Sequence, residues 1–294
     1  MSLTQEDLFN KSTTTGDVKR TVALPRIFRR QQHTIQEVLL KESLLAVNLA
    51  LGVSDINELR EKFVAALPQN SQGTRRRYAD LLMRWFFRDG AQGFATKVWE
   101  SFQSEEIQTA IHRYLYLAAE PIVGTCVTSA LCRLSEGVVV PGDYLAGVTT
   151  KLLSHELSTQ TKKRLLANLR KLGFLERSAA GDRVVSPALN KTALLLALHH
   201  AFNVDHQRSI EFSTLTANPF WLFIGLRTED SLRDFLKEAV HIGYLGKYVV
   251  ADRLEQVTTC LPPDECGTSP SSVVMICVSA SPFAKPPRGA VWQS

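Results

Sequence analysis

The sequence has few of the features that mark an enzyme, a metalloprotein or a membrane protein. Its five cysteines form no CxxC pair, which argues against a zinc site or a disulfide framework. The motifs GxGxxG, GxxxxGK[ST] and HExxH are absent. No apolar run approaches the roughly 20 residues of a membrane helix, and no apolar segment near the N-terminus indicates a secretory signal. We therefore expect a cytoplasmic chain with no catalytic residues, no metal, no small-molecule cofactor and no membrane contact.

Two groups of side chains have the residue types of a metal site or of a catalytic triad. His199, His200 and His206 suggest a metal site, but neighbouring helical residues point about 100° apart and no carboxylate or cysteine completes the set. Residues 154–156 are Ser-His-Glu, the residue types of a catalytic triad. A triad needs these side chains to converge from separate elements, whereas here they are consecutive. The sequence predicts a turn at this point.

Composition and charge indicate a globular chain with one basic region. The 294 residues allow one large or two ordinary domains, and 45% of them are hydrophobic. Residues 141–191 contain nine Lys/Arg and four Asp/Glu, so this stretch alone carries an excess equal to the net charge of +5 of the whole chain. Such a concentration of positive charge is typical of nucleic-acid-binding proteins.

Residues 158–185 combine a predicted basic helix with a predicted hairpin. Ser158 is a good N-cap, and Gly173 stands where a left-handed C-terminal cap is needed. Three leucines recur with the spacing of a buried helix face, Leu165, Leu169 and Leu172. The turn signal at residues 180–182 lies between apolar residues and predicts a hairpin. This order is that of a recognition helix followed by a wing.

The helix face opposite the leucines is the candidate DNA-binding surface. It carries Gln160, Lys163, Arg164, Arg170 and Lys171 around the small Ala167. A small residue among long basic ones lets a helix approach a groove while its neighbours reach phosphates. We predict that the four cations contact the DNA backbone and that Gln160 contacts a base edge. Arg177 and Arg183 flank the predicted wing. The alternatives are a solvated helix face or a protein-docking surface.

A second basic cluster opens another predicted helix. Arg75, Arg76 and Arg77 follow Ser71 and point in three directions, so one or two of them could reach a phosphate surface. Arginines at a helix start oppose the helix dipole, which favours an external anion. A solvated helix start and an RNA-binding surface remain alternatives.

The patterning predicts a mainly α protein, with an N-terminal helical bundle followed by winged-helix-like helix-plus-hairpin units. The predicted parts are a flexible basic arm (1–30), a helical bundle (31–137), a winged-helix-like domain (138–258) and a Pro/Ser-rich tail (259–294). The first helix is expected to include residues 35–45, strands are expected at 210–212 and 220–224, and a further strand is possible within 273–278. A second helix and hairpin over 229–258 repeats the order of the first. Its helix is acidic, so we expect no DNA contact there.

Four sequence pieces follow one another within residues 35–258. They are Glu42-Ser43-Leu44-Leu45, Ser71-x-x-Thr74-Arg75-x-Arg77, Leu169-x-x-Leu172-Gly173-Phe174-Leu175 and Asn218-Pro219-x-Trp221-Leu222-Phe223. In this order they resemble the BrxA family of bacterial BREX phage-exclusion systems. The resemblance implies a non-enzymatic, mostly helical, DNA-binding subunit that works beside a methyltransferase and other phage-defence proteins. The longer N-terminal arm and the C-terminal tail depart from the family pattern.

Together these features predict a double-stranded DNA-binding protein with weak sequence preference and mainly phosphate contacts. The competing hypothesis is a protein-interaction scaffold within a larger complex, in which the basic helix meets an acidic partner.

Overall fold

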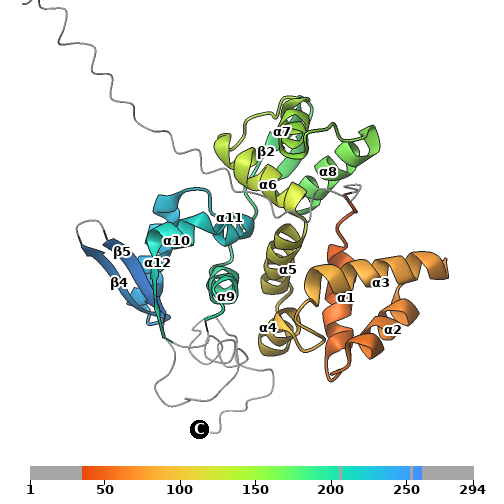
Figure 1. Cartoon of the computed structure of the whole chain (residues 1–294), viewed down its shortest axis with the longest axis horizontal. Coiled ribbons are helices and arrows are strands. Elements are labelled where there is room, and N and C mark those ends of the chain that lie inside the picture. The colour runs from red at the N-terminus through yellow and green to blue at the C-terminus, as the bar shows by residue number, and fades with distance from the viewer. Residues whose placement is uncertain (1–34, 205–206, 252–253, 260–294) are drawn as a thin grey trace, which may run out of the picture. The chain divides into compact units, whose positions relative to one another are not determined.

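The computed structural model describes residues 35–204, 207–251 and 254–259, and these residues form one compact unit (Figure 1). The fold is mainly helical, as predicted. The first helices are α1 (Leu40–Ala50), α2 (Ile56–Ala66), α3 (Gln72–Phe86), α4 (Phe94–Phe102) and α5 (Glu105–Ala119). The predicted arm at residues 1–30 and the predicted strand within 273–278 lie outside the described residues.

Two helix-plus-hairpin units follow α5. The first contains α6 (Pro121–Ser129), the 3-10 turn η2 (Leu131–Arg133), α7 (Tyr144–Leu153), α8 (Thr159–Lys171), β1 (Leu175–Ser178) and β2 (Gly181–Val184). The second contains α9 (Lys191–Ala201), β3 (Ser209–Glu211), α10 (Phe212–Ala217), α11 (Phe220–Ile224), α12 (Glu229–His241), β4 (Leu245–Ala251) and β5 (Leu254–Thr259).

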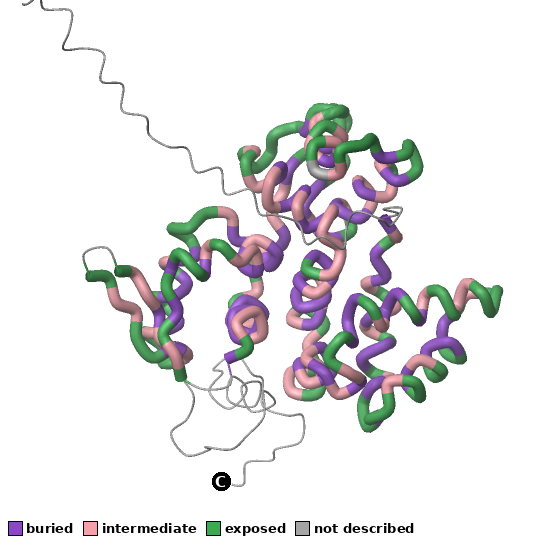
Figure 2. Tube along the Cα trace, in the orientation of Figure 1, coloured by how far each residue is buried: buried purple, intermediate pink, exposed green. Residues whose placement is uncertain are grey.

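Helix α5 lies at the centre of the core. It contacts α1, α3 and α4 on one side and α6, α9 and α11 on the other. Buried positions follow it along its length in Figure 2, and Ile111, Tyr116 and Leu117 are almost completely inaccessible. Residue 137 is the predicted boundary between the helical bundle and the winged-helix-like domain. Helices from both sides of this boundary therefore share one core.

Two of the first helices begin after residues that are common at helix starts. Asp55 accepts a hydrogen bond from the Asn57 backbone N–H at 2.9 Å, and Ser71 stands at the N-cap of α3. Asp55 thereby satisfies one of the backbone donors that a helix start leaves without a partner.

One predicted element is wrong, and the first predicted helix begins later than expected. Residues 35–39 are not helical, because the Val38 N–H donates to the side chain of Asn168 at 3.0 Å instead of to a helical carbonyl. Phe220–Ile224 is the helix α11 and not a strand. Most of its side chains are buried, and a short, fully buried apolar run has no periodicity that separates a helix from a strand.

The two units share the order helix, edge, helices and hairpin, with two helices between edge and hairpin in the first unit and three in the second. In the first, the extended segment 138–140 lies beside β2 as an edge of the sheet. The Val184 N–H donates to Val138 O at 2.8 Å, and the Val140 N–H donates to Asp182 O at 2.7 Å. Its order across the sheet is therefore edge, β2, β1. The second unit has the order β3, β5, β4. Helices α8 and α12 both have 13 residues and begin 70 residues apart.

No single helix among the described residues is long and apolar enough to cross a membrane. Only α5 taken together with Pro121–Arg133, a pair bent by 103°, reaches the required length and composition.

Candidate nucleic-acid interface

The basic helix α8 has the ends that the sequence predicts. The Ser158 hydroxyl accepts a hydrogen bond from the Thr161 N–H at 3.2 Å. At the other end Gly173 has a φ of +80°, and the Phe174 N–H donates back to Leu169 O at 2.9 Å. This is the glycine-terminated helix end that leads the chain directly into β1.

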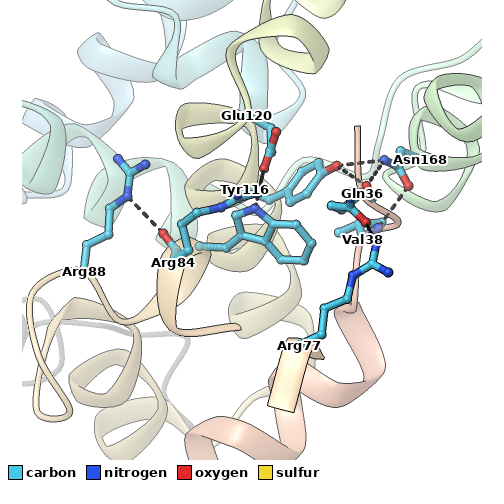
Figure 3. Close-up of polar contacts among 9 residues, drawn as sticks. Gln36, Val38, Arg77, Arg84, Arg88, Tyr116, Glu120 and Asn168 are labelled. Atoms are coloured by element: carbon cyan, nitrogen blue, oxygen red, sulfur yellow. Dashed lines mark hydrogen bonds and ion pairs between the residues drawn. The ribbon is translucent and has the colours of Figure 1, made fainter. Parts of the chain in front are cut away.

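The leucine face of α8 is buried as predicted, and it also contains two buried polar residues that the leucine pattern does not predict, Thr161 and Asn168. Asn168 is fully buried. Its Oδ1 accepts from the Val38 N–H, and its Nδ2 donates to Gln36 O at 2.7 Å and to the Tyr116 hydroxyl at 2.8 Å (Figure 3). Asn168 thus fixes α8 to α5 and to the segment 36–38. In the sequence, the position of Asn168 beside the leucine stripe is the one feature that indicates this anchoring role.

The two halves of the predicted basic face of α8 have different surroundings. At its C-terminal end, Arg170 donates from Nε and Nη2 to both carboxylate oxygens of Asp182, at 2.7 and 2.6 Å. The hydrogen bonds with Asp182 raise the pKa of Arg170. Lys171 forms an ion pair with Glu37. Both cations therefore neutralise carboxylates of the protein itself.

The N-terminal half of the same face is different. Gln160 and Lys163 are exposed and Arg164 is half-buried. Within the described part of the chain, none of these three side chains forms a hydrogen bond or an ion pair. The neighbouring Lys162 points to Glu156 at 3.4 Å. Two cations and one amide are thus available to an external partner.

The two arginines of the hairpin also differ in whether a carboxylate of the protein neutralises them. Arg183 stands directly opposite Glu176 in the antiparallel pair and donates to its carboxylate at 2.5 and 3.2 Å. Arg177 is exposed and has no carboxylate partner among the described residues. Only Arg177 therefore adds unneutralised charge to the candidate surface.

The arginines of α3 lie beside the same segment as α8. Arg77 donates to the side chain of Gln36, whose backbone carbonyl accepts from Asn168 (Figure 3). Arg76 is exposed, whereas Arg75 is half-buried. The structure therefore brings two basic clusters that are far apart in sequence to opposite sides of residues 36–38.

The second unit lacks a basic helix, as the sequence predicts. In α12, Arg233 donates to Glu255 at 2.8 Å and to Asp230 at 2.9 Å, and its guanidinium lies 4.2 Å from the centre of the Phe212 ring. Lys191 on α9 neutralises Glu238. Acidic side chains remain in excess on α12.

No group of three or more His, Cys, Asp or Glu side chains is arranged to hold a metal within residues 35–204, 207–251 and 254–259. The predicted turn at 154–156 is present, with Ser154 as the left-handed cap of α7. His206, which the sequence analysis grouped with His199 and His200, lies outside the described residues.

Comparison of the chain with models of protein families, with curated proteins and with solved structures finds no match.

Proposed function

We propose that this protein binds double-stranded DNA through the N-terminal half of α8. Lys163 and Arg164 contact phosphates, and Gln160 lies nearest a base edge. The observation that carries the proposal is the division of the α8 face, in which these side chains have no internal partner in the described chain while Arg170 and Lys171 do. Phosphate contacts supply most of the affinity of such an interface and little of its specificity.

The order of elements supports the same proposal. The first unit runs from a helix through the edge at 138–140 and two further helices to a hairpin, and its sheet has the order edge, β2, β1. A winged helix has the same order of elements. In that reading α7 and α8 form the helix-turn-helix, α8 enters the major groove and the β1–β2 hairpin is the wing. Arg177 would then reach an adjacent phosphate.

The remaining predicted cations take different roles in this proposal. Arg170, Lys171 and Arg183 fix the positions of the hairpin and of α8 through Asp182, Glu37 and Glu176. Arg76 extends the surface from α3, whereas the half-buried Arg75 contributes less. On the resemblance to the BrxA family, we propose that this non-enzymatic DNA binding serves a bacterial phage-defence complex, with other defence proteins as partners.

The experiment is a gel-shift titration of the full chain with random-sequence duplex DNA. We expect wild type to bind at low salt and the Lys163→Ala/Arg164→Ala variant to bind about tenfold or more weakly, since each lost phosphate contact removes part of the electrostatic affinity. The matched control is Lys237→Ala/Lys247→Ala, which removes the same charge from two exposed positions of the second unit. Equal weakening by both pairs would contradict a defined interface on α8.

The second candidate function, a protein-interaction scaffold, is favoured by one observation. The second unit repeats the order of the first but presents an acidic helix, which would repel DNA. A protein partner that co-purifies without nucleic acid, and that the Lys163→Ala/Arg164→Ala variant retains, would support this function.

A further inference from the structure

The outer strand of the second unit, β4, has a free edge. The sheet has the order β3, β5, β4, so β5 pairs with β4 on one side, and no strand of the described chain pairs with β4 on the other. The β4 strand has seven residues, whereas β3 at the opposite edge has three. The β4–β5 hairpin lies at the margin of the fold (Figure 1). An edge strand of this length is a ready template for another strand.

The corresponding edge of the first unit is protected, and that of β4 is not. In the first unit the free edge is β1, which has four residues and carries Glu176 and Arg177. Short length and charged side chains are common ways in which proteins protect an edge. The β4 strand carries one charge, Lys247, and a bulge interrupts it only near its start. Its Val250 is 67% exposed, the highest value for a large hydrophobic residue in the described chain.

The register of the hairpin determines which backbone groups of β4 point away from β5. Ala251 and its partner on β5 are separated by two residues, and in a hairpin of this length the flanking pair is hydrogen-bonded. Hydrogen-bonded pairs alternate along an antiparallel ladder, so Val249 also faces β5, while Tyr248 and Val250 direct their N–H and C=O outward. Thr259 on β5 agrees with this alternation, since its N–H donates at 2.9 Å to the residue before β3.

These outward groups match a second, antiparallel copy of β4 with the two-fold axis at Val249. In this register Tyr248 of each copy pairs with Val250 of the other, which gives four backbone hydrogen bonds. Each exposed Val250 then lies beside a Tyr248 ring, and cross-strand pairs of an aromatic and a β-branched residue stabilise sheets. Lys247 stands opposite Ala251 of the other copy, so like charges do not oppose each other.

We propose that β4 pairs with β4 of a second copy of this chain, so that the two three-stranded sheets join into one continuous sheet. The same residues meet on both copies, as in most two-fold dimers. The pairing uses no residue of the α8 surface and does not rest on DNA binding.

The first experiment is sedimentation velocity of the full chain, free of nucleic acid, over a series of concentrations. Wild type is expected to reach twice the mass of one chain. Val250→Pro is expected to dimerise at least about tenfold more weakly, because it removes the outward N–H from both copies and so two of the four hydrogen bonds. Val250→Thr keeps this N–H and a branched side chain. It is the matched control and is expected to dimerise like wild type.

A charge exchange at Val249 tests the register itself. Val249→Lys and Val249→Glu each place two like charges opposite each other at the two-fold axis, so each variant alone is expected to dimerise more weakly than wild type. An equimolar mixture of the two is expected to associate more strongly than either alone, because opposite charges then meet. These changes keep the backbone of the hairpin, so they test the proposal even where Val250→Pro does not fold.

The outcomes separate this dimer from other partners of the edge and from the α8 surface. Lys163→Ala/Arg164→Ala is expected to dimerise like wild type, so a failure of DNA binding and a failure of the dimer can be told apart. A monomeric wild type would overturn the proposal, as expected if a peptide or another segment of the chain pairs with β4. A dimer that Val250→Pro and both Val249 variants retain unchanged, or a mixture that associates no more than its components, would overturn it as well.

Discussion

Arg170 on α8 and Asp182 on β2 form a two-pronged ion pair, with two N–O distances of 2.7 and 2.6 Å. The Asp182 side chain is only 12% exposed, so this pair is shielded from water more than an ordinary surface pair. It fixes the direction in which the hairpin leaves the helix. The second unit contains the same relationship, in which Arg233 on α12 donates to Glu255 on β5.

Replacing Arg170 with Ala is therefore expected to destabilise the protein. The change leaves the shielded Asp182 carboxylate without its donors, and we expect the free energy of unfolding to fall by about 1–3 kcal/mol. Chemical denaturation of the variant beside Lys163→Ala measures this difference, since Lys163 has no internal ion pair in the described chain and should change stability by less than about 0.5 kcal/mol. Equal stabilities would show that the pair does not fix the hairpin.

Asn168 is expected to be the most sensitive polar position of α8. Its side chain satisfies Val38 N–H, Gln36 O and the Tyr116 hydroxyl inside the protein. Asn168→Leu leaves the Val38 N–H without its acceptor and removes one donor from Gln36 O and one from the Tyr116 hydroxyl, which still bond to each other at 3.2 Å. We expect a loss of about 2 kcal/mol or more in the free energy of unfolding. A thermal melt checks this, with Gln160→Leu on the exposed face of the same helix as the control. An unchanged melting temperature would contradict the anchoring role.

Two of the glycines that follow helix ends provide a matched pair. Gly173 and Gly243 have φ values of +80° and +83°, so alanine at either position adopts a left-handed conformation that costs about 1–2 kcal/mol. A Cβ at Gly173 would also come within 3.3 Å of the Pro187 Cβ, whereas a Cβ at Gly243 would meet nothing within 4 Å. We expect Gly173→Ala to be the more destabilising of the two by denaturation. If Gly243→Ala is instead the more destabilising variant, the contact of the new Cβ with Pro187 is relieved without a loss of stability.

Buried histidines are expected to make the fold sensitive to acid. His112 is fully buried, and desolvation lowers its pKa to about 3. The Ser43 hydroxyl donates to Leu40 O, so His112 Nδ1 donates to Ser43, while His112 Nε2 accepts from Gln108. The neutral ring thus uses both nitrogens, and Nε2, which carries no proton, cannot take one without losing its bond from Gln108.

The direction of the pH effect follows from these pKa values. Both histidines, His112 and His199, are neutral in the folded state well below pH 6.5, where the unfolded chain already binds protons. Their contribution to stability is complete above about pH 6.5 and is lost as pH falls toward the folded-state pKa values. Between about pH 6 and 5 we expect the free energy of unfolding to fall by about 1.4 kcal/mol per pH unit for each histidine. Denaturation of wild type and His112→Gln in this window should show a slope smaller by about one proton in the variant.

Local signals in the sequence predicted much of the fold and less of the site. Ser158, Gly173 and the leucine stripe define α8 correctly because caps and periodicity act within a few residues of one another. The division of the basic face was not predictable, since the partners Asp182 and Glu37 are brought to Arg170 and Lys171 by tertiary packing. The same reason explains the error at residues 35–39, whose backbone is fixed by Asn168, 130 residues away.

The central claim is that Lys163 and Arg164 are the DNA-contacting cations of α8 and that Arg170 and Lys171 are not. Its most direct test is the salt dependence of duplex affinity for wild type, Lys163→Ala/Arg164→Ala and Lys171→Ala. Each lost phosphate contact reduces the slope of log K against log salt by about 0.9. We predict a slope smaller by nearly two such steps in the double variant and an unchanged slope in Lys171→Ala. An unchanged slope in the double variant, or no duplex binding by wild type at low salt, would contradict the account.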